Sequence, residues 1–365
     1  MMIIGIDASR ATRTVRSGTE NYSFELIRRL VTADKVNKFV LYTPNFPKEK
    51  WPEAKNITWR VLPSRRLWSQ IQLAGELRRE KPDVLFVPSH VVPLLSNLPT
   101  VVTIHDIAYR YFPKTYSKFD RRYLHFSTSV SLAKADAVIV PSQSTKSNII
   151  KEYKANSAKV HIIPMAHNCE LFNATRNYGN APISSPYILF TGSIEEKKNI
   201  RLLIEAFCIL AKSRKDILLV MIGKMGFGSE KIVDFVNTLE PSLASRIFMP
   251  GFVPKYDLLR YLRHAKLFAY PSSYDGFAFV VLEALSVGTP VVCSNSSSLP
   301  EIVDDAAVLL PPNNPLRWAS TFAKILDSTT LASDLRQKGI KRAKMYSWDK
   351  TVQETLTVIR QVANG

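Results

Sequence analysis

Two acidic residues flank a strand–turn–helix junction late in the chain. Asp275 and Glu283 stand eight positions apart in the run YDGFAFVVLEAL, which follows one apolar run and precedes another. Three residues between them are expected to place their backbone N–H groups at the helix start: Gly276, Phe277 and Ala278. Unpaired amides and the positive end of the helix dipole favour a bound phosphate there. The arrangement suits a sugar nucleotide, whose hydroxyls meet carboxylates while its diphosphate meets N–H groups.

A second strand–glycine–helix junction carries lysines. The run TGSIEEKKN ends at Asn199, follows the apolar segment 187–190 and precedes an apolar helical pattern. Lys198 beside a helix start adds a full positive charge to the partial charge of the dipole. Without an anion a lysine in a first helical turn is unfavourable, so Lys198 is interpreted as a phosphate ligand. Lys197 and Ser193 are its neighbours at the same predicted site.

The first half of the chain has two comparable positions. His105 and Asp106 follow the apolar run 101–104, and a histidine at the mouth of a strand can donate to a sugar hydroxyl or a developing negative oxygen. Gly18 and Thr19 open the first predicted helix after a basic loop, where glycine permits close backbone approach to an anion. A locally satisfied core histidine and a plain turn remain the structural alternatives.

Segment 109–123 mixes basic and aromatic residues. Such a segment fits an anionic membrane surface, with its rings at the interface. It fits a single-stranded nucleic acid equally well. A packed aromatic face with a solvated basic face is the third interpretation. Because the segment follows His105 directly, we expect it near the entrance for an acceptor substrate.

Apolar strands and amphipathic helices alternate along the whole chain, which predicts parallel sheets covered by helices on both faces. The polar stretch 173–182 interrupts the pattern and is the predicted linker. The segment from Ser347 to Val362 reads as a capped amphipathic helix. The predicted strands are 3–6, 39–42, 84–87, 101–104, 137–140 and 160–163 before the linker, then 187–190, 217–222, 247–249, 267–270, 291–293 and 308–310 after it.

The amino-acid composition limits the classes of protein to which the chain could belong. The 365 residues suffice for two domains, and 46% hydrophobic residues with 22% charged residues are typical of a globular chain. Three widely spaced cysteines argue for a reducing compartment. No window reaches the ~20 apolar residues of a membrane span, and the first residues read as a strand, so a cytoplasmic protein is expected. The net charge is +18, with a surplus of 12 in residues 1–170. Such a field attracts nucleic acid, anionic lipid or phosphorylated substrates.

The spacing of Asp275 and Glu283 resembles the E-x7-E signature of retaining glycosyltransferases with the GT-B fold, especially glycosyltransferase family 4. The usual first glutamate is Asp275 here, and the usual second glycine is Ala278. Lys198 matches the family lysine that holds the donor phosphates, whereas Ser193 replaces a basic residue. The resemblance also covers the Gly18 loop, His105-Asp106, and the loop containing Val253, which resembles the segment that backs the nucleotide base.

The resemblance implies two Rossmann-like domains with parallel sheets facing across a cleft. Residues 1–172 would form the acceptor-side domain, residues 185–346 the donor-binding domain, and residues 347–365 a helix crossing back to the first domain. It further implies retaining transfer of a hexose from a GDP- or UDP-sugar to a glycan or lipid-linked acceptor. Glu283 would hold the ribose, Asp275 and His105 would orient the sugar, and Lys198 would stabilise the departing diphosphate. The enzyme would be cytoplasmic, with an anionic membrane surface as a candidate partner.

No Asp-x-Asp, Walker-type loop, G-x-G-x-x-G or His-Glu-x-x-His motif occurs in the sequence. The lack of Asp-x-Asp counts against a metal-dependent sugar transferase, so neither a metal nor another cofactor is expected. Two other functions stay open. An enzyme of the same fold could hydrolyse or epimerise a sugar nucleotide, and a basic protein of another class could bind nucleic acid. Nucleic acid is not the expected partner.

Overall fold

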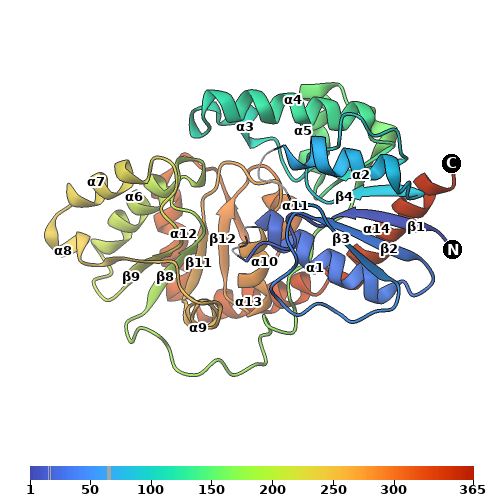
Figure 1. Ribbon diagram of the computed structural model, residues 1–365. Coiled ribbons are helices and arrows are strands. Elements are labelled where there is room, and N and C mark those ends of the chain that lie inside the picture. The colour runs from blue at the N-terminus through green and yellow to red at the C-terminus, as the bar shows by residue number, and fades with distance from the viewer. Residues whose placement is uncertain (15, 17, 64–66) are drawn as a thin grey trace. The chain divides into compact units, whose positions relative to one another are not determined.

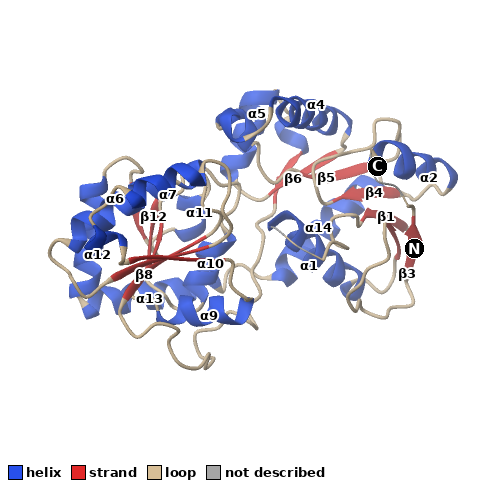
Figure 2. Cartoon of the chain, turned by 60° about the vertical axis from the view of Figure 1, so that its left-hand side comes forward, coloured by secondary structure: helices blue, strands red, loops and turns tan. Residues whose placement is uncertain are grey.

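The computed structural model describes residues 1–14, 16, 18–63 and 67–365, which form two compact units. Unit 1 comprises Met1–Ala166 and Ser347–Gly365, and unit 2 comprises His167–Tyr346. Each unit is a parallel sheet with helices on both faces (Figures 1 and 2). The α/β class and the two parallel sheets expected from the alternating pattern are therefore confirmed.

The sheet of unit 1 has seven strands in the order β3-β2-β1-β4-β5-β6-β7. Every neighbouring pair is parallel. Chain order reverses between β1 and β4, which makes this pair the switch point of the sheet. The strands are β1 (Ile3–Asp7), β2 (Lys38–Thr43), β3 (Ile57–Val61), β4 (Val84–Val87), β5 (Thr100–Thr103), β6 (Ala137–Val140) and β7 (Val160–Ile162).

The helices of unit 1 include one that comes from the end of the chain. That helix begins after Ser347, whose hydroxyl accepts the N–H of Lys350, and it packs on the first helix. Arg360 donates to the Asp34 carboxylate at 2.7 Å. The helices are α1 (Gly18–Ala33), α2 (Ala74–Arg79), α3 (Ala108–Tyr111), α4 (Lys118–Lys134), α5 (Gln143–Tyr153) and α14 (Trp348–Ala363), with short turns Ser69–Leu73, Pro113–Thr115 and Ser157–Lys159.

The sheet of unit 2 has six parallel strands in the order β10-β9-β8-β11-β12-β13, with its switch point between β8 and β11. The strands are β8 (Tyr187–Thr191), β9 (Leu218–Ile222), β10 (Ile247–Gly251), β11 (Leu267–Tyr270), β12 (Val291–Ser294) and β13 (Val308–Leu310). The helices are α6 (Ile200–Ala211), α7 (Ser229–Asn237), α8 (Pro241–Ala244), α9 (Lys255–His264), α10 (Phe279–Ser286), α11 (Leu299–Val303), α12 (Pro315–Asp327) and α13 (Thr329–Ala343), with the 3₁₀ turn Glu196–Lys198.

The predicted linker 173–182 has no helix or strand, but it is anchored to unit 2. Tyr178 is buried and joins the core of that unit together with Phe172. Its hydroxyl accepts the N–H of Asn173 at 2.7 Å and donates to the carbonyl of Leu171 at 2.6 Å. Although the segment is mostly polar, the buried Tyr178 packs in the core of unit 2, so the segment is part of that unit.

Candidate active site

The switch point of unit 2 brings two distant segments together. Strands β8 and β11 are hydrogen-bonded neighbours, although β9 and β10 lie between them in the sequence. In open parallel sheets, ligands bind beyond the carboxyl ends of the strands at such a point. The loops after Thr191 and after Tyr270 both begin there. These loops carry the predicted phosphate lysine and the first predicted acid.

The loop after β8 is held against its neighbours by backbone contacts. Gly192 has φ +140°, and a side chain on Gly223 would stand 1.8 Å from the Gly192 carbonyl oxygen, so only glycine fits at Gly223. The N–H of Ser273 then donates to the carbonyl of Lys197 at 2.9 Å. This bond ties the lysine loop to the loop after β11.

The two lysines lie on the 3₁₀ turn Glu196–Lys198, not in the first turn of an α-helix as expected. Asn199, with φ +54°, separates this turn from α6. Lys198 therefore lies before α6, and the expectation that it opposes the helix dipole from the first turn is wrong. Lys197 lies 3.5 Å from the carboxylate of Glu195, and its side chain is partly exposed.

Lys198 is buried and meets two groups at the end of β11. Its Nζ donates to the Tyr270 hydroxyl at 2.8 Å and forms an ion pair with the Asp275 carboxylate. The two charged side chains are 9% and 14% exposed, so water screens their attraction little. Residues 77 positions apart in the chain thus form one charged cluster, which was predicted as two separate phosphate and sugar contacts.

Asp275 is held by its backbone as well. The hydroxyls of Ser297 and Ser298, which follow β12, both donate to the Asp275 carbonyl, at 2.6 and 2.9 Å. One carboxylate oxygen, Oδ2, is buried without a hydrogen-bond partner. An unsatisfied buried carboxylate oxygen is costly, and such a position is typical of a group that completes its contacts with a ligand.

The helix that follows Asp275 begins later than expected. Its first residue is Phe279, and Ala278 is the N-cap, without a side-chain capping bond. The amides of Gly276 and Phe277 therefore precede the helix, which corrects the expectation that they form its first turn. Phe279 and Val280 occupy the first two helical positions, whose N–H groups have no acceptor within a helix.

Glu283 lies in the second turn of α10 and is partly buried. Burial raises the pKa of Glu283 to about 7, and the opposing charge comes from Lys255 at the start of α9. Val253, the predicted base contact, lies two residues before Lys255 and packs partly buried against the core of unit 2. Ser193 is exposed in the loop after β8.

In unit 1, His105 lies just beyond the carboxyl end of β5 and is buried. Its Nε2 hydrogen-bonds the Pro88 carbonyl at 2.9 Å, and its ring packs edge-on against Tyr22, with the centroids 4.9 Å apart. Because a carbonyl only accepts, Nε2 carries the proton and Nδ1 is the acceptor, which is buried without a partner. Burial and the neighbouring His90 lower the pKa of His105 to about 3. The imidazole is therefore neutral at physiological pH.

Gly18 is the first residue of α1, as predicted, and it is exposed, while Thr19 is partly buried. The basic loop before them is partly neutralised. Arg10 and Arg13 both donate to the buried Glu20 carboxylate, at 3.1 and 3.4 Å. This start of α1 therefore carries less free positive charge than the sequence suggests.

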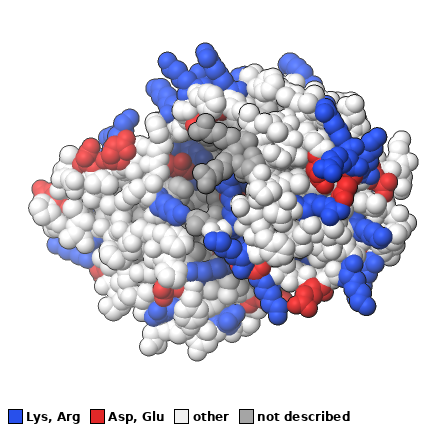
Figure 3. Space-filling view, in the orientation of Figure 1, with Lys and Arg blue, Asp and Glu red and all other residues white. Residues whose placement is uncertain are grey.

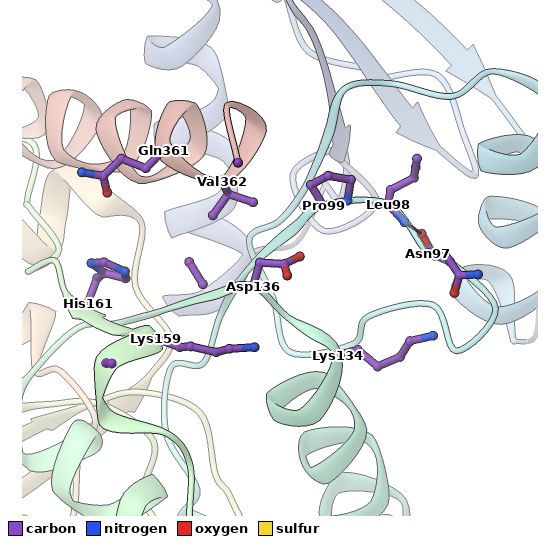
Figure 4. A pocket seen from close by; sticks show the side chains of 13 residues that line it. Asn97, Leu98, Pro99, Lys134, Asp136, Lys159, His161, Gln361 and Val362 are labelled. Carbon is purple, nitrogen blue, oxygen red and sulfur yellow. Dashed lines mark hydrogen bonds between the residues drawn. The ribbon is translucent and has the colours of Figure 1, made fainter.

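A large cavity of about 1320 Å³ lies in unit 1, beyond the carboxyl ends of β1 and β4. Three residues of the predicted basic and aromatic segment line it: Phe119, Asp120 and Tyr123. A second cavity, of about 710 Å³, lies near the first residues of β5 and β6 (Figure 4). There Lys134 and Lys159 donate to main-chain carbonyls and Asp136 accepts the Thr100 N–H, so its charged groups are already engaged.

Among the residues that the structure describes, no cluster of three His, Cys, Asp or Glu side chains could hold a metal ion. None of the helices in the described ranges is both long and apolar enough to span a bilayer.

Comparison with known proteins defines the class. Residues 16–171 match the model of Glycosyltransferase Family 4, and residues 173–342 match that of Glycosyl transferases group 1. The chain is 26% identical to the O-antigen chain mannosyltransferase B of Escherichia coli, over 94% of this chain and 96% of that protein. Its fold is similar to sucrose-phosphate synthase from Thermosynechococcus elongatus (TM-score 0.79, 19% identity, 99% of each chain). It also resembles HepE of Anabaena in complex with UDP (TM-score 0.74, 15% identity, 99% and 100% covered).

The two sheets with their C-terminal helix and the matched models define a GT-B glycosyltransferase that uses a nucleotide-sugar donor. The chain belongs to glycosyltransferase family 4.

Sequence reasoning missed two residues beside the predicted ones. Tyr270 was assigned only to an apolar strand, although it is the last residue of that strand and holds Lys198. Asp7 was not singled out because it directly follows the predicted strand 3–6, although it lines the large cavity of unit 1. Both polar side chains end a strand at a switch point, and the sheet order that places those strand ends there is known only from the structure.

Proposed function

We propose that the protein is a retaining, metal-independent hexosyltransferase that moves a sugar from a GDP- or UDP-sugar to a glycan or lipid-linked acceptor. One observation carries the proposal: the buried cluster of Lys198, Asp275 and Tyr270 at the switch point of unit 2. A fixed lysine at the ligand-binding edge of a nucleotide-binding sheet supplies the positive charge that a departing diphosphate needs.

In the proposed reaction, the bond between the anomeric carbon and the β-phosphate oxygen breaks. The acceptor oxygen bonds to the same face of that carbon, and its hydroxyl proton passes to the leaving phosphate. Lys198 stabilises the developing charge on the diphosphate, aided by the first amides of α10. Glu283 binds the ribose hydroxyls as a carboxylate, and His105 presents a neutral imidazole to the sugar.

In this scheme Asp275 contacts Lys198, whereas its position in the motif implies contact with the sugar. In the absence of donor, its carboxylate pairs with Lys198. We infer that it orients the lysine, and that donor binding brings a phosphate oxygen to the same Nζ. Its shorter side chain, compared with glutamate, suits contact with the lysine rather than with the sugar.

The test is a panel of UDP-, GDP- and ADP-sugars in thermal unfolding with EDTA present, followed by NMR of the products. A donor that binds the folded state adds ~2.7 kcal/mol to the free energy of unfolding at a concentration of a hundred times its Kd, and this raises the melting temperature. We expect one donor to stabilise the protein and to yield a glycoside with the donor's anomeric configuration. Free sugar as the sole product would favour a hydrolase or epimerase. An inverted glycoside, or activity lost with EDTA, would contradict the proposal.

Helix α4 suits contact with a lipid-linked acceptor at a membrane surface. Its first nine residues expose the rings of Phe119 and Phe126 together with three basic residues: Lys118, Arg121 and Arg122. A group of Lys and Arg side chains projects from the top of the view in Figure 3, which has the orientation of Figure 1, where α4 lies at the top. Interfacial aromatics with cations are attracted to anionic headgroups, at ~1 kcal/mol per cation.

We therefore expect sedimentation with vesicles that contain 30% phosphatidylserine and little binding to pure phosphatidylcholine vesicles. Exchanging Arg121 and Arg122 for glutamine should weaken binding about 30-fold, whereas exchanging the exposed Arg78 and Arg79 of α2 should not. Equal binding by both double variants would contradict a role for α4.

A further inference from the structure

The hydroxyl of Tyr270, at the end of β11, is one of two partners of the buried lysine. Lys198 Nζ donates to this hydroxyl oxygen at 2.8 Å, and it also forms the ion pair with Asp275. A lysine ammonium group has three N–H donors and no acceptor, so these two contacts leave one N–H for a third partner. Tyr270 and Asp275 together therefore set the direction of the remaining N–H.

The ring of Tyr270 is fixed by packing. The residue is 2% exposed, and its ring stacks nearly parallel to two other rings, Phe190 of β8 at 5.7 Å and Phe268 of β11 at 5.9 Å between centroids. Side chains in a close-packed core move little, whereas lysine has a flexible four-carbon stem. The Tyr270 hydroxyl is therefore a rigid contact for the mobile end of Lys198.

Tyr270 differs from Asp275 as a partner because it carries no charge. Burial raises the pKa of Tyr270 well above its ordinary value, and the negative charge of Asp275 raises it further. The phenol is therefore neutral at physiological pH. A phosphate oxygen at Nζ competes with the Asp275 carboxylate for the same positive charge. A neutral hydroxyl does not compete in this way, so Tyr270 can stay bonded to Lys198 while a phosphate is bound.

The rest of the lysine loop adds little free positive charge near Lys198. Lys197 lies 3.5 Å from the Glu195 carboxylate, and Ser193 has no charge. The stabilisation of a departing diphosphate by this loop therefore depends on where Lys198 Nζ is held, because electrostatic stabilisation requires a charge that is already in place when the reaction occurs.

We propose that Tyr270 is a positioning residue for sugar transfer, whose hydroxyl holds Lys198 Nζ at the place where the β-phosphate oxygen gains charge. This role rests on the glycosyltransferase function proposed above. As the bond to the anomeric carbon breaks, its electron pair passes to that oxygen, which is more negative in the transition state than in the bound donor. A displaced ammonium group therefore affects the rate more than it affects donor binding.

The test compares two tyrosine-to-phenylalanine variants. Tyr270→Phe removes the hydroxyl and keeps the stacked ring. Tyr187→Phe is the matched control, because Tyr187 is 1% exposed, begins the neighbouring strand β8 and donates its hydroxyl to the Tyr261 carbonyl at 2.8 Å. The donors are UDP-glucose and GDP-mannose, with methyl mannoside or methyl glucoside as acceptor. Release of UDP or GDP is measured, since it reports every broken donor bond, whether the sugar passes to an acceptor or to water.

We expect Tyr270→Phe to lower kcat about tenfold and to change KM for the donor less than about threefold, since one hydrogen bond to a charged group is lost. Tyr187→Phe should leave kcat within about twofold of normal. Both variants should lose a similar amount of thermal stability, because each loses one buried hydroxyl. In a Lys198→Ala background, Tyr270→Phe should not lower kcat further, because the hydroxyl acts through the lysine.

Three results would overturn the role of Tyr270: an unchanged kcat in Tyr270→Phe, an equal fall in Tyr187→Phe, or a loss that persists in the absence of Lys198. Normal activity of Lys198→Ala alone, or no release of UDP or GDP by the unaltered protein, would instead contradict the proposed function.

Discussion

Replacing Lys198 by alanine will lower kcat/KM for sugar transfer by about a hundredfold or more. The change removes the fixed cation that would face the departing diphosphate, and one such contact is typically worth ~3 kcal/mol in the barrier. It also leaves the Asp275 carboxylate buried without its ion-pair partner, and that carboxylate already has one unpaired oxygen. Breaking a buried pair in this way costs about 3–5 kcal/mol of stability. Transfer rates and the free energy of unfolding in urea check the two effects.

A double variant separates catalysis from folding. Lys198→Met combined with Asp275→Leu removes both charges and fills their volume, so stability should return to within about 2 kcal/mol of the unaltered protein, since apolar replacements of buried pairs are often neutral. Activity should remain lost. Lys212→Ala, at the exposed far end of α6, is the control for loss of a lysine. Transfer within threefold of normal in a folded Lys198→Ala protein would rule out the proposed role.

Replacing Glu283 by glutamine will weaken donor binding about 10- to 100-fold, because a carboxylate that accepts two ribose hydroxyls forms stronger bonds than an amide. Burial raises the pKa of Glu283 to about 7 in the folded free protein. The donor should therefore bind the unaltered enzyme more tightly as pH rises through 7 and the carboxylate forms. Calorimetric titration with the donor from pH 5.5 to 8.5 measures both effects. Glu230→Gln, on the exposed first turn of α7, provides the control.

Glu283 should have the opposite pH dependence in its effect on stability: its contribution to donor binding grows as pH rises, whereas its contribution to stability falls. A carboxyl group whose folded pKa lies above its unfolded value stabilises the fold fully below about pH 4.5, and this contribution is lost as pH rises through about 7. Glutamine has no proton to lose. Between pH 5 and pH 8 the unaltered protein should therefore lose stability relative to Glu283→Gln, so the free energy of unfolding of the variant should rise relative to that of the unaltered protein. Parallel pH profiles for the two proteins would show that Glu283 is not buried as a carboxyl group.

The sequence predicted most strands because continuous apolar runs mark strands that are buried on both faces. It failed at β3, an edge strand in which Thr58 and Arg60 interrupt the apolar residues and neither face is fully buried. The helix after Asp275 was placed too early because Ala278 provides no capping side chain that would mark the boundary. The lysine turn was read as helix because Asn199, a residue type that adopts the left-handed conformation more often than most, was not taken as a boundary.

The ion pair at the candidate site could not be predicted from the sequence. Lys198 and Asp275 could each be singled out from local context, yet their ion pair depends on β8 lying beside β11. That neighbour relation is a property of sheet order, which a strand list does not contain. Tyr270 was missed for the same reason, since an apolar strand pattern does not reveal which strand end lies at the switch point. Sheet topology therefore turns two motifs into one site.

A structure of the protein with a bound nucleoside diphosphate will show whether Lys198 faces the donor phosphates. We expect Lys198 Nζ within ~3 Å of a β-phosphate oxygen, and the Glu283 carboxylate hydrogen-bonded to the ribose hydroxyls. A diphosphate bound elsewhere, with Lys198 still paired only to Asp275 and Tyr270, would contradict this expectation.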